Sequence, residues 1–183
     1  MKPTGIVRRI DDLGRIVIPK EIRRTLRIRE SDPLEIYTGA QGEVIFKKYS
    51  PVGELNAFAA DYAEVLARTA GVRVLITDRD RVVAAAGVPR KDWLDAPVTP
   101  QLERLMESRR LQLPPPGTLF AAAVDAPAAR TVRLAAPIVA AGDVAGCVVF
   151  LAEEAPAAEA APGETEQKLA GVAAALLSRQ LEA

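Results

Sequence analysis

The sequence predicts an α+β protein made of two small domains joined by a helix. Charge is the first observation behind this prediction: residues 1–29 carry nine Lys and Arg side chains against three acids, a net charge of +6. Because the chain of 183 residues has 24 basic and 24 acidic residues, residues 30–183 carry a net charge of −6. The second observation is the segment Ser-Pro-Val-Gly at 50–53, which interrupts the hydrophobic pattern and predicts a domain boundary after residue 53. The third is a succession of short strand and helix patterns after that boundary.

The first 29 residues are expected to form a strand, a turn, a second strand and a helix. Residues 5–10 alternate between two faces, residues 15–18 are rich in β-branched side chains, and the Asp-Asp-Leu-Gly sequence between them is typical of a turn. Pro19 opens the helix, where its missing N–H costs nothing, and Ile22 and Leu26 are expected to face inward. The basic residues of this helix recur at i, i+3, i+4 and i+7 and therefore form one stripe: Lys20, Arg23, Arg24 and Arg27.

A second pair of strands completes the predicted first domain, residues 1–53. Residues 34–37 and 43–49 alternate with the period of a strand, and the Gly-Ala-Gln-Gly sequence at 39–42 is typical of a hairpin turn.

A helix is expected next, over residues 54–69, and ends before Gly71. Its apolar side chains recur at helical spacing: Leu55, Phe58, Ala59, Tyr62, Val65 and Leu66. Two hypotheses stay open for residues 54–70: they form a dimerisation helix that connects the two domains, or they pack on their own C-terminal domain. Both hold if the two contacts use different faces of the helix.

Residues 71–183 are expected to form an antiparallel sheet flanked by helices. Strand patterns occupy residues 72–77, 81–86, 119–124, 131–137 and 144–152. Helical patterns occupy residues 100–110 and 164–181, and the second helix is expected to turn one apolar side inward: Leu169, Val172, Ala173, Leu176, Leu177 and Leu181. Residues 88–97 are expected to be a loop with the only tryptophan, and residues 153–163 to be a loose loop rich in Ala, Pro and Glu.

The composition excludes several kinds of catalytic and metal site. The chain has no histidine, so it has no His base, no Ser-His-Asp triad and no His metal site. Its single cysteine, Cys147, excludes an internal disulfide and a Cys zinc cluster, and we expect it to be buried and inert. Asp78 and Asp80 alternate with arginines, which is typical of a solvated turn. We therefore expect no enzyme, no cofactor and no metal.

The sequence also predicts where the protein is found. No apolar run reaches the length of about 18 residues that a transmembrane helix needs. Arginines separate the first hydrophobic residues, unlike in a signal peptide, and the single cysteine fits a reducing compartment. We therefore expect a cytoplasmic protein.

The basic N-terminal segment indicates a polyanion as partner. Clustered guanidinium groups repel one another, and the planar Arg side chain suits phosphate because it makes two parallel charge-assisted bonds. Arg8 and Arg15 stand on either side of the predicted turn and can therefore come close together. The alternative hypothesis is a solvated basic face paired with nearby acids, but Glu21 is the only acid on the helix that could neutralise the stripe.

The segment KPTGIVRRIDDLGRIVIPKEIRRTLRI, followed by EIYTGAQGEVIFKKYSP, resembles the DNA-binding domain of the AbrB-type transition-state regulators. The resemblance implies a swapped-hairpin β-barrel, in which strands of two chains interleave into a dimer that binds double-stranded DNA. A physical reason supports the dimer, because about fifty residues with short strands bury too little apolar surface to stand alone. The arginines that this family places on DNA match Arg8, Arg15, Arg23 and Arg24. Weaker candidates, taken from their positions, are Arg9, Lys20, Arg27 and Lys2.

The rest of the chain resembles members of that family that carry a GAF-like domain after a linker helix, in segments such as VLITDRDRVVAAAG and APIVAAGDVAGCVVF. This resemblance implies a nucleoid-associated activator and repressor of sporulation genes that favours AT-rich duplex DNA. It also implies a homotetramer formed through the GAF-like domains, residues 71–183. Two roles stay open for this domain: sensing an unidentified small-molecule effector, or oligomerisation alone.

Two other functions stay open beside transcription regulation. An antitoxin with the same N-terminal fold would continue in a mostly disordered tail, whereas residues 71–183 carry strand and helix patterns. A sensing or scaffold protein would bind RNA or an acidic protein with its basic end. Tyr37 and Tyr49, however, lack the interleaving with basic residues that stacking on single strands needs.

Overall fold

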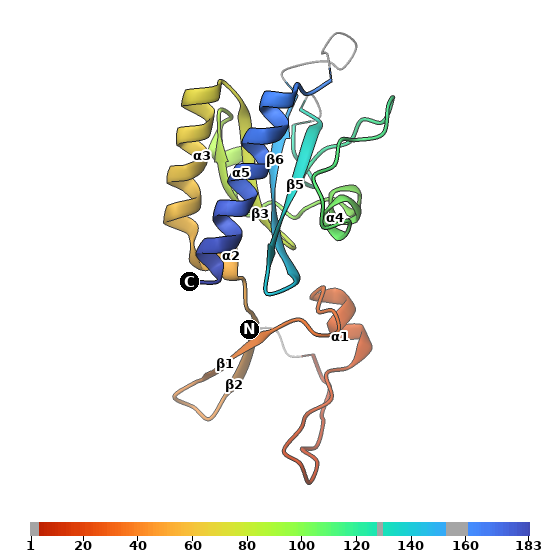
Figure 1. Ribbon diagram of the computed structural model, residues 1–183. Coiled ribbons are helices and arrows are strands. Elements are labelled where there is room, and N and C mark those ends of the chain that lie inside the picture. Colours follow the sequence, from red (N-terminus) through yellow and green to blue (C-terminus); the bar gives the residue numbers. More distant parts are fainter. Residues whose placement is uncertain (1–3, 128–129, 153–160) are drawn as a thin grey trace. The chain divides into compact units, whose positions relative to one another are not determined.

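The computed structural model describes residues 4–127, 130–152 and 161–183 and forms two units, one that ends at Tyr49 and one that begins at Ser50 (Figure 1). Lys2 and most of the loop expected over residues 153–163 lie outside the described residues. In the described ranges, no helix is long and apolar enough to cross a membrane.

The first unit contains one short helix and one β-hairpin. α1 spans Lys20–Thr25, β1 spans Leu34–Thr38, and β2 spans Val44–Lys48. β1 and β2 pair in antiparallel register. Two backbone hydrogen bonds close the turn between them, from the Gly42 N–H to the Gly39 oxygen (3.2 Å) and from the Gly39 N–H to the Glu43 oxygen (2.8 Å). The hairpin predicted over residues 34–49 is therefore confirmed.

The two strands predicted over residues 5–10 and 15–18 are wrong for the single chain, because neither forms among the described residues. The turn between them is present. The Gly14 N–H donates to the Asp11 oxygen (3.0 Å), the Asp11 N–H donates to the Arg15 oxygen (3.1 Å), and Gly14 has a φ of 77°. β-branched residues form a strand only where a neighbouring strand satisfies their backbone hydrogen bonds, and a single chain supplies no such neighbour here.

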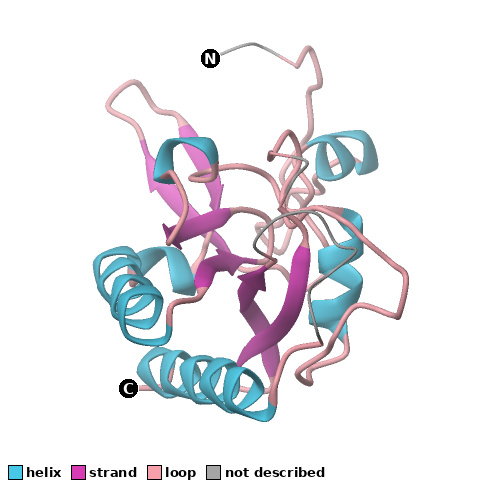
Figure 2. Ribbon diagram, turned by 90° about the horizontal axis from the view of Figure 1, so that it is seen from above, coloured by secondary structure: helices cyan, strands magenta, loops and turns pink. Residues whose placement is uncertain are grey.

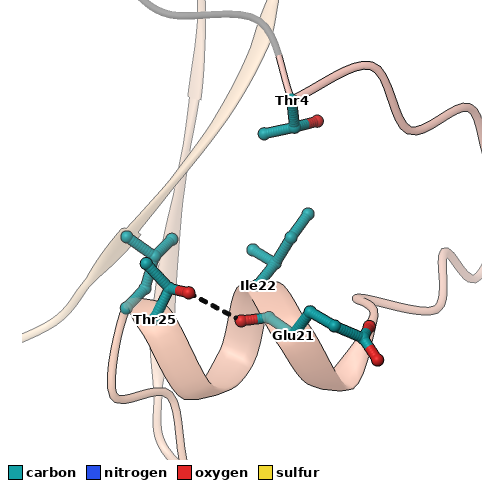
Figure 3. A pocket seen from close by; sticks show the side chains of 5 residues that line it. Thr4, Glu21, Ile22 and Thr25 are labelled. Atoms are coloured by element: carbon teal, nitrogen blue, oxygen red, sulfur yellow. Dashed lines mark hydrogen bonds between the residues drawn. The ribbon is translucent and has the colours of Figure 1, made fainter.

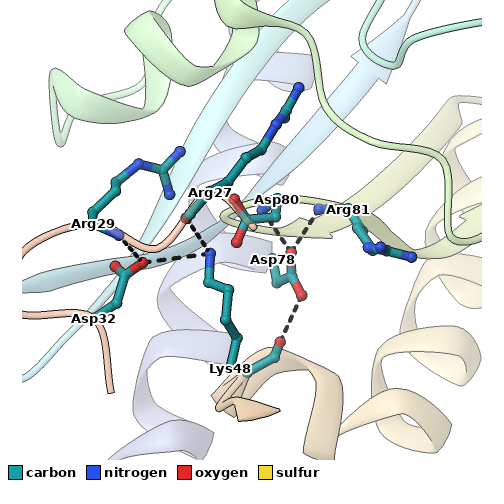
Figure 4. A network of polar contacts seen from close by, with 8 residues as sticks. Arg27, Arg29, Asp32, Lys48, Asp78, Asp80 and Arg81 are labelled. Carbon is teal, nitrogen blue, oxygen red and sulfur yellow. Dashed lines mark hydrogen bonds and ion pairs between the residues drawn. The ribbon is translucent and has the colours of Figure 1, made fainter. Parts of the chain in front are cut away.

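α1 is shorter than predicted, and the basic stripe loses its last member. The helix ends at Thr25, and the Leu26 side chain is 57% exposed instead of facing inward. Arg27 leaves the helical conformation with a φ of 51°. Lys48 of β2 stabilises this turn, because its Nζ donates to the Arg27 carbonyl oxygen (2.9 Å) and lies 3.4 Å from Oδ2 of Asp32 (Figure 4).

The first unit has almost no core of its own. Pro19 is the only buried residue among the described residues 4–49, and the Val7 side chain is 89% exposed. An open hollow of about 220 Å³ lies beside α1 (Figure 3), lined by Thr4, Glu21, Ile22, Thr25 and Leu26. Folding depends on removing apolar surface from water, so the described residues of this unit need a further surface to pack against.

The second unit is built on a four-stranded antiparallel sheet with the order β4-β3-β6-β5. Its strands are β3 (Arg73–Asp78), β4 (Val82–Ala86), β5 (Val132–Ala140) and β6 (Asp143–Leu151). The β5–β6 hairpin turns at Ala141 and Gly142, whose φ values of 49° and 85° are those of a two-residue hairpin turn. Four of the five strands predicted in this part of the chain are therefore confirmed.

Helices cover both faces of this sheet (Figure 1 and Figure 2). α3 (Asn56–Ala70) and α5 (Glu164–Leu181) lie on one face, and α4 (Pro100–Glu107) lies on the other. Successive side chains of a strand lie on opposite faces of the sheet. Val74 and Ile76 therefore share a core with α3 and α5, whereas Leu75 shares a core with α4. The prediction of an antiparallel sheet flanked by helices is therefore confirmed.

Residues 50–53 begin a short helix, α2 (Pro51–Glu54), where the sequence predicted only a break. Ser50 Oγ accepts the Gly53 N–H (3.0 Å) and donates to Oδ2 of Asp78 (2.7 Å; Figure 4). Oδ1 of Asp78 accepts the N–H groups of Asp80 and Arg81, both at 2.7 Å. The turn predicted at Asp78 and Asp80 is therefore present, and Asp78 is a partly buried residue that organises this turn and anchors the start of the second unit.

The strand predicted over residues 119–124 is also wrong. The segment forms a single bridge, from Ala123 to Val98, and its other backbone hydrogen bonds go to separate partners, Pro97, Thr99 and Val132, and make no continuous ladder. Three prolines at 114–116 precede it and supply no N–H donors, which keeps the chain before it out of a ladder. The loop expected over residues 88–97 contains a 3₁₀ helix, Arg90–Asp92, and buries Trp93 completely.

α3 and α5 bury mainly alanines, with one leucine each, and expose several larger apolar side chains. The buried residues of the two helices are Ala59, Ala63 and Leu66 on α3 and Ala170, Ala173, Ala174 and Leu177 on α5. Val172 is 62% exposed, and Leu176 is exposed as well, so the apolar side predicted for α5 is wrong at these two residues. The hypothesis that the linker helix packs on its own C-terminal domain is confirmed.

An ion pair ties α5 to the sheet. Arg133 of β5 donates from Nε to Oε1 of Glu166 (3.1 Å) and from Nη2 to Oε2 (3.0 Å). Oε2 also accepts the Gly163 N–H (2.9 Å) and so caps the helix. Chiefly because of the bonds from Arg133, the pKa of the Glu166 carboxyl lies below its ordinary value.

Candidate nucleic-acid interface

The first unit exposes most of the cations that the sequence singled out. Arg23 is half-buried, and the other described candidates are exposed: Arg8, Arg9, Arg15, Lys20, Arg24 and Arg27. Arg8, Arg9 and Arg15 flank the turn at residues 11–14, Lys20, Arg23 and Arg24 lie on the helix α1, and Arg27 follows the end of that helix. Lys2 lies outside the described residues.

α1 brings three of these cations together. Pro19 stands at its N-terminus, and Lys20, Arg23 and Arg24 are spaced i, i+3 and i+4, so they are neighbours on the helix surface. Arg23 and Arg24 occupy the last turn, where the helix dipole favours positive charge. Arg27 does not belong to this group, because the helix has ended at Thr25.

The turn at residues 11–14 does not by itself bring Arg8 beside Arg15. Its hydrogen bonds connect Asp11 with Gly14 and Arg15, and no backbone bond joins residues 5–10 to residues 15–18 in the described part of the chain. The closeness of Arg8 and Arg15 therefore stays a prediction from the sequence.

Four of the arginines have no acidic partner in the described part of the chain. Within residues 4–127, 130–152 and 161–183, the side chains of Arg8, Arg9, Arg23 and Arg24 form no ion pair. A guanidinium group in this state keeps five N–H donors for an incoming anion. Phosphate is the anion that this planar donor set fits best, so the alternative of a basic face paired with nearby acids has no support at these positions.

Arg15 differs because it has an acidic partner. Its Nε donates to Oδ2 of Asp11 (2.8 Å), and its backbone N–H donates to Oδ1 (2.8 Å). The backbone N–H of Arg15, and then its guanidinium, hold the pKa of the Asp11 carboxyl below its ordinary value. From the sequence, Asp11 was placed in the predicted turn and counted as a charge opposed to the basic cluster, but it was not paired with Arg15. A signal for its structural role was present, since turns favour Asp at their first position and Gly at their fourth, here Gly14.

Other reactive groups are scarce in the described structure. No group of His, Cys, Asp or Glu side chains that could hold a metal ion is found among the described residues. Cys147 is fully buried in β6, as expected, and burial raises the pKa of its thiol far above the ordinary value. A thiol that stays protonated is a poor nucleophile, so Cys147 serves as a small core residue.

The second unit matches a known family over nearly its whole length. The family model described as "Stage V sporulation protein T C-terminal, transcription factor" matches residues 54–182. Stage V sporulation protein T of Bacillus subtilis (strain 168) is 47% identical over 182 residues, which cover 100% of this chain and 99% of that relative. The chain belongs to the stage V sporulation protein T family.

The basic segment of this family member has further relatives. The model described as "Antidote-toxin recognition MazE, bacterial antitoxin" matches residues 7–53. The transition state regulatory protein AbrB of Bacillus subtilis (strain 168) is 61% identical over 51 residues, 28% of this chain and 52% of AbrB. The solution structure of the N-domain of the transcription factor AbrB, also 61% identical, covers 27% of this chain and 92% of that chain with a TM-score of 0.25. The resemblance to the AbrB-type regulators is therefore confirmed: an AbrB-type N-terminal domain precedes the C-terminal domain of the stage V sporulation protein T family.

Proposed function

We propose that this protein is a DNA-binding transcription regulator of sporulation, acting in the cytoplasm at the nucleoid. The observation that carries the proposal is a set of arginines, Arg8, Arg9, Arg23 and Arg24, that form no ion pair among the described residues and lie on a segment that is 61% identical to AbrB. The similarity to stage V sporulation protein T over the full chain supports sporulation as the process that the protein regulates. A transcription factor is not an enzyme, in line with the absence of catalytic motifs from the sequence.

In this proposal, Arg8, Arg15, Arg23 and Arg24 bind the phosphates of double-stranded DNA, and some of them reach base edges in the major groove. Arg9 and Lys20 add to the positive field from neighbouring positions, and Arg27 and Lys2 are weaker contributors. Affinity for AT-rich DNA without a strict consensus would come from the shape and deformability of the duplex. Such a protein can activate at one promoter and repress at another.

The DNA-binding unit is proposed to be a dimer of interleaved hairpins. The support is physical: among the described residues 4–49 only Pro19 is buried, and both faces of the β1–β2 hairpin are largely exposed. A second copy would cover the hollow beside α1 and supply strand partners to residues 5–10 and 15–18. Interleaving two chains closes the exposed sheet edges and builds the core that one chain lacks.

The second unit is proposed to be a GAF-like domain that pairs two such dimers into a homotetramer. α3 and α5 each carry exposed apolar side chains, Phe58 and Val65 on α3 and Val172 and Leu176 on α5, and we call these four residues the α3–α5 surface. The rings of Phe58 and Tyr62 are parallel, with centroids 6.1 Å apart. Exposed apolar side chains that gather on neighbouring helices are typical of self-association sites.

Replacing Val172 by Glu is expected to convert the tetramer into dimers, because a charge in an apolar interface loses its hydration without gaining a partner. Light scattering after size-exclusion chromatography measures the mass, which should halve. Gln101→Glu adds the same charge at an exposed position of α4, on the other face of the sheet, and is the control that should leave the mass unchanged. Equal masses for Val172→Glu and wild type would show that the tetramer forms elsewhere.

Small-molecule sensing is the alternative role for the second unit. One observation favours it: the Nε1–H of the buried Trp93 has no hydrogen-bond partner among the described residues. A ligand with an acceptor group could satisfy this donor.

An antitoxin is the alternative function for the whole chain, favoured by the match of residues 7–53 to the MazE model. Residues 50–183 form a packed unit instead of the mostly disordered tail expected of such a protein.

The test of the proposed function is binding to a fluorescent AT-rich duplex, measured by anisotropy across a salt series. A dimer with four arginines per protomer on phosphate neutralises about eight phosphates, and a protein that neutralises 6–10 of them binds about a thousandfold or more weakly at 200 mM than at 50 mM salt. The comparisons are double-stranded RNA of matching sequence and a GC-rich DNA duplex of the same length. Equal affinity for RNA, or affinity that does not change with salt, would contradict the proposal.

A further inference from the structure

The side chain of Asp11 is divided between two tasks. Oδ1 accepts the backbone N–H groups of Leu13 (3.0 Å) and Arg15 (2.8 Å), which closes the turn. Oδ2 accepts the Nε–H of the Arg15 side chain (2.8 Å) and takes no part in the turn. One oxygen therefore shapes the backbone, and the other orients a guanidinium group.

The bond to Oδ2 leaves Arg15 able to bind an anion. The Arg15 side chain is 69% exposed, and the bond uses one of its five N–H donors, so the four donors of its terminal amino groups stay available. With its backbone N–H and its Nε both bound to Asp11, the residue is held at two points. A side chain ordered before binding loses less conformational entropy when it binds.

The position of this carboxylate is otherwise unfavourable for a DNA-binding surface. A negative charge within the Debye length of about 10 Å at 0.1 M salt repels phosphate. The depressed pKa of Asp11 means that it is ionised at neutral pH. Its neighbour Asp12 carries the same charge, is exposed, and has no ion pair among the described residues, so the two acids differ in their contacts and not in their charge.

We propose that Asp11 is a positioning residue for DNA binding: its Oδ2 holds the Arg15 guanidinium in the orientation that receives a phosphate. The inference rests on the proposed function and adds one residue to the binding machinery, an acid that strengthens the binding of a polyanion. It predicts that removing the charge of Asp11 weakens DNA binding, whereas electrostatics alone predicts the opposite.

The test compares Asp11→Asn with Asp12→Asn. Asparagine keeps an Oδ1 that can accept the turn's N–H groups, but it replaces Oδ2 by an amino group that cannot accept the Nε–H of Arg15. Asp11→Asn is expected to weaken binding to the AT-rich duplex by about threefold to tenfold, in the lower part of the range for coupling between residues that touch directly. Asp12→Asn, with the same change in charge, should bind as tightly as wild type or more tightly. Circular dichroism checks that both variants are folded.

The same substitution in the Arg15→Ala background separates positioning from a change in the turn. With no guanidinium to orient, Asp11→Asn should no longer weaken binding there. A loss of equal size in both backgrounds would place the effect in the turn and overturn the positioning role. Tight binding by Asp11→Asn, with a steep salt dependence retained in wild type, would overturn this role alone, whereas failure of the wild type to bind duplex DNA would overturn the proposed function and this role with it.

Discussion

Replacing Arg23 and Arg24 together by Ala is expected to weaken binding to the AT-rich duplex by at least about a hundredfold, because each charge-assisted hydrogen bond is worth about 1.5–3 kcal/mol. The two side chains are adjacent on α1 and have no ion pair in the described part of the chain, so their removal leaves no acid unpaired. Anisotropy titrations over a salt series measure both affinity and slope. The plot of log K against log salt should flatten by about 0.9 for each phosphate that the variant no longer neutralises.

A control of equal charge separates direct binding from long-range attraction. Arg104 and Arg179 are exposed on α4 and α5 of the second unit and form no ion pair among the described residues. Replacing both by Ala removes the same two charges, and binding should fall only slightly at physiological salt because distant charges are screened. Equal losses of affinity for the two double variants would mean that net charge, and not the α1 arginines, sets the affinity.

The sheet of the second unit could be predicted because the residues of each strand by themselves follow a strand pattern. Leu75 stands between Val74 and Ile76, and all three are apolar because both faces of the sheet are covered. The outward face of α5 could not be predicted in the same way. Hydrophobicity assigns Val172 and Leu176 to the core, but a helix that packs closely on a sheet has room for Ala, and the larger residues turn outward.

The first unit shows a different limit of sequence reasoning. The β-branched residues at 15–18 predict a strand that the structure does not contain, because the hydrogen-bond partners of a strand have to come from elsewhere and one chain does not supply them. Arg27 fits the period of the basic stripe, yet the helix ends two residues earlier. Asp11 was counted as one of three acidic charges. A count of charges does not reveal which carboxylate oxygen accepts from which N–H donor, so the bond from Arg15 to Asp11 was not predicted. The assignment of Arg8, Arg15, Arg23 and Arg24 to DNA stays a prediction.

Replacing Gly146 by Ala is expected to destabilise the second unit by about 3 kcal/mol or more, the upper range for single substitutions that overpack a core. Gly146 lies in the central strand β6, opposite Asp78 of β3 and Ile138 of β5. A Cβ at this position would overlap the carbonyl oxygen of Thr77. That oxygen belongs to the backbone of the neighbouring strand, so it can move away only if the β3–β6 ladder is disturbed.

Gly171→Ala is the matched control for this substitution, since no atom lies within 4 Å of the new Cβ on α5. In a helix, Ala is favoured over Gly by about 0.5–1 kcal/mol, so this variant should be slightly more stable than wild type. Urea unfolding followed by circular dichroism gives both values. A Gly146→Ala variant as stable as wild type would mean that β3 and β6 do not approach this closely.

The same variant also connects stability to function. If the second unit serves to join two DNA-binding dimers, then at a temperature where this unit is unfolded in Gly146→Ala but folded in wild type, the variant should be a dimer that still binds a single site through α1. Binding to a duplex with two sites should then lose its avidity, which exceeds the affinity for one site by about 10²–10⁴-fold when two linked modules bind together. Unchanged avidity on two sites, in a variant whose second unit is unfolded, would show that the N-terminal domains assemble on DNA without it.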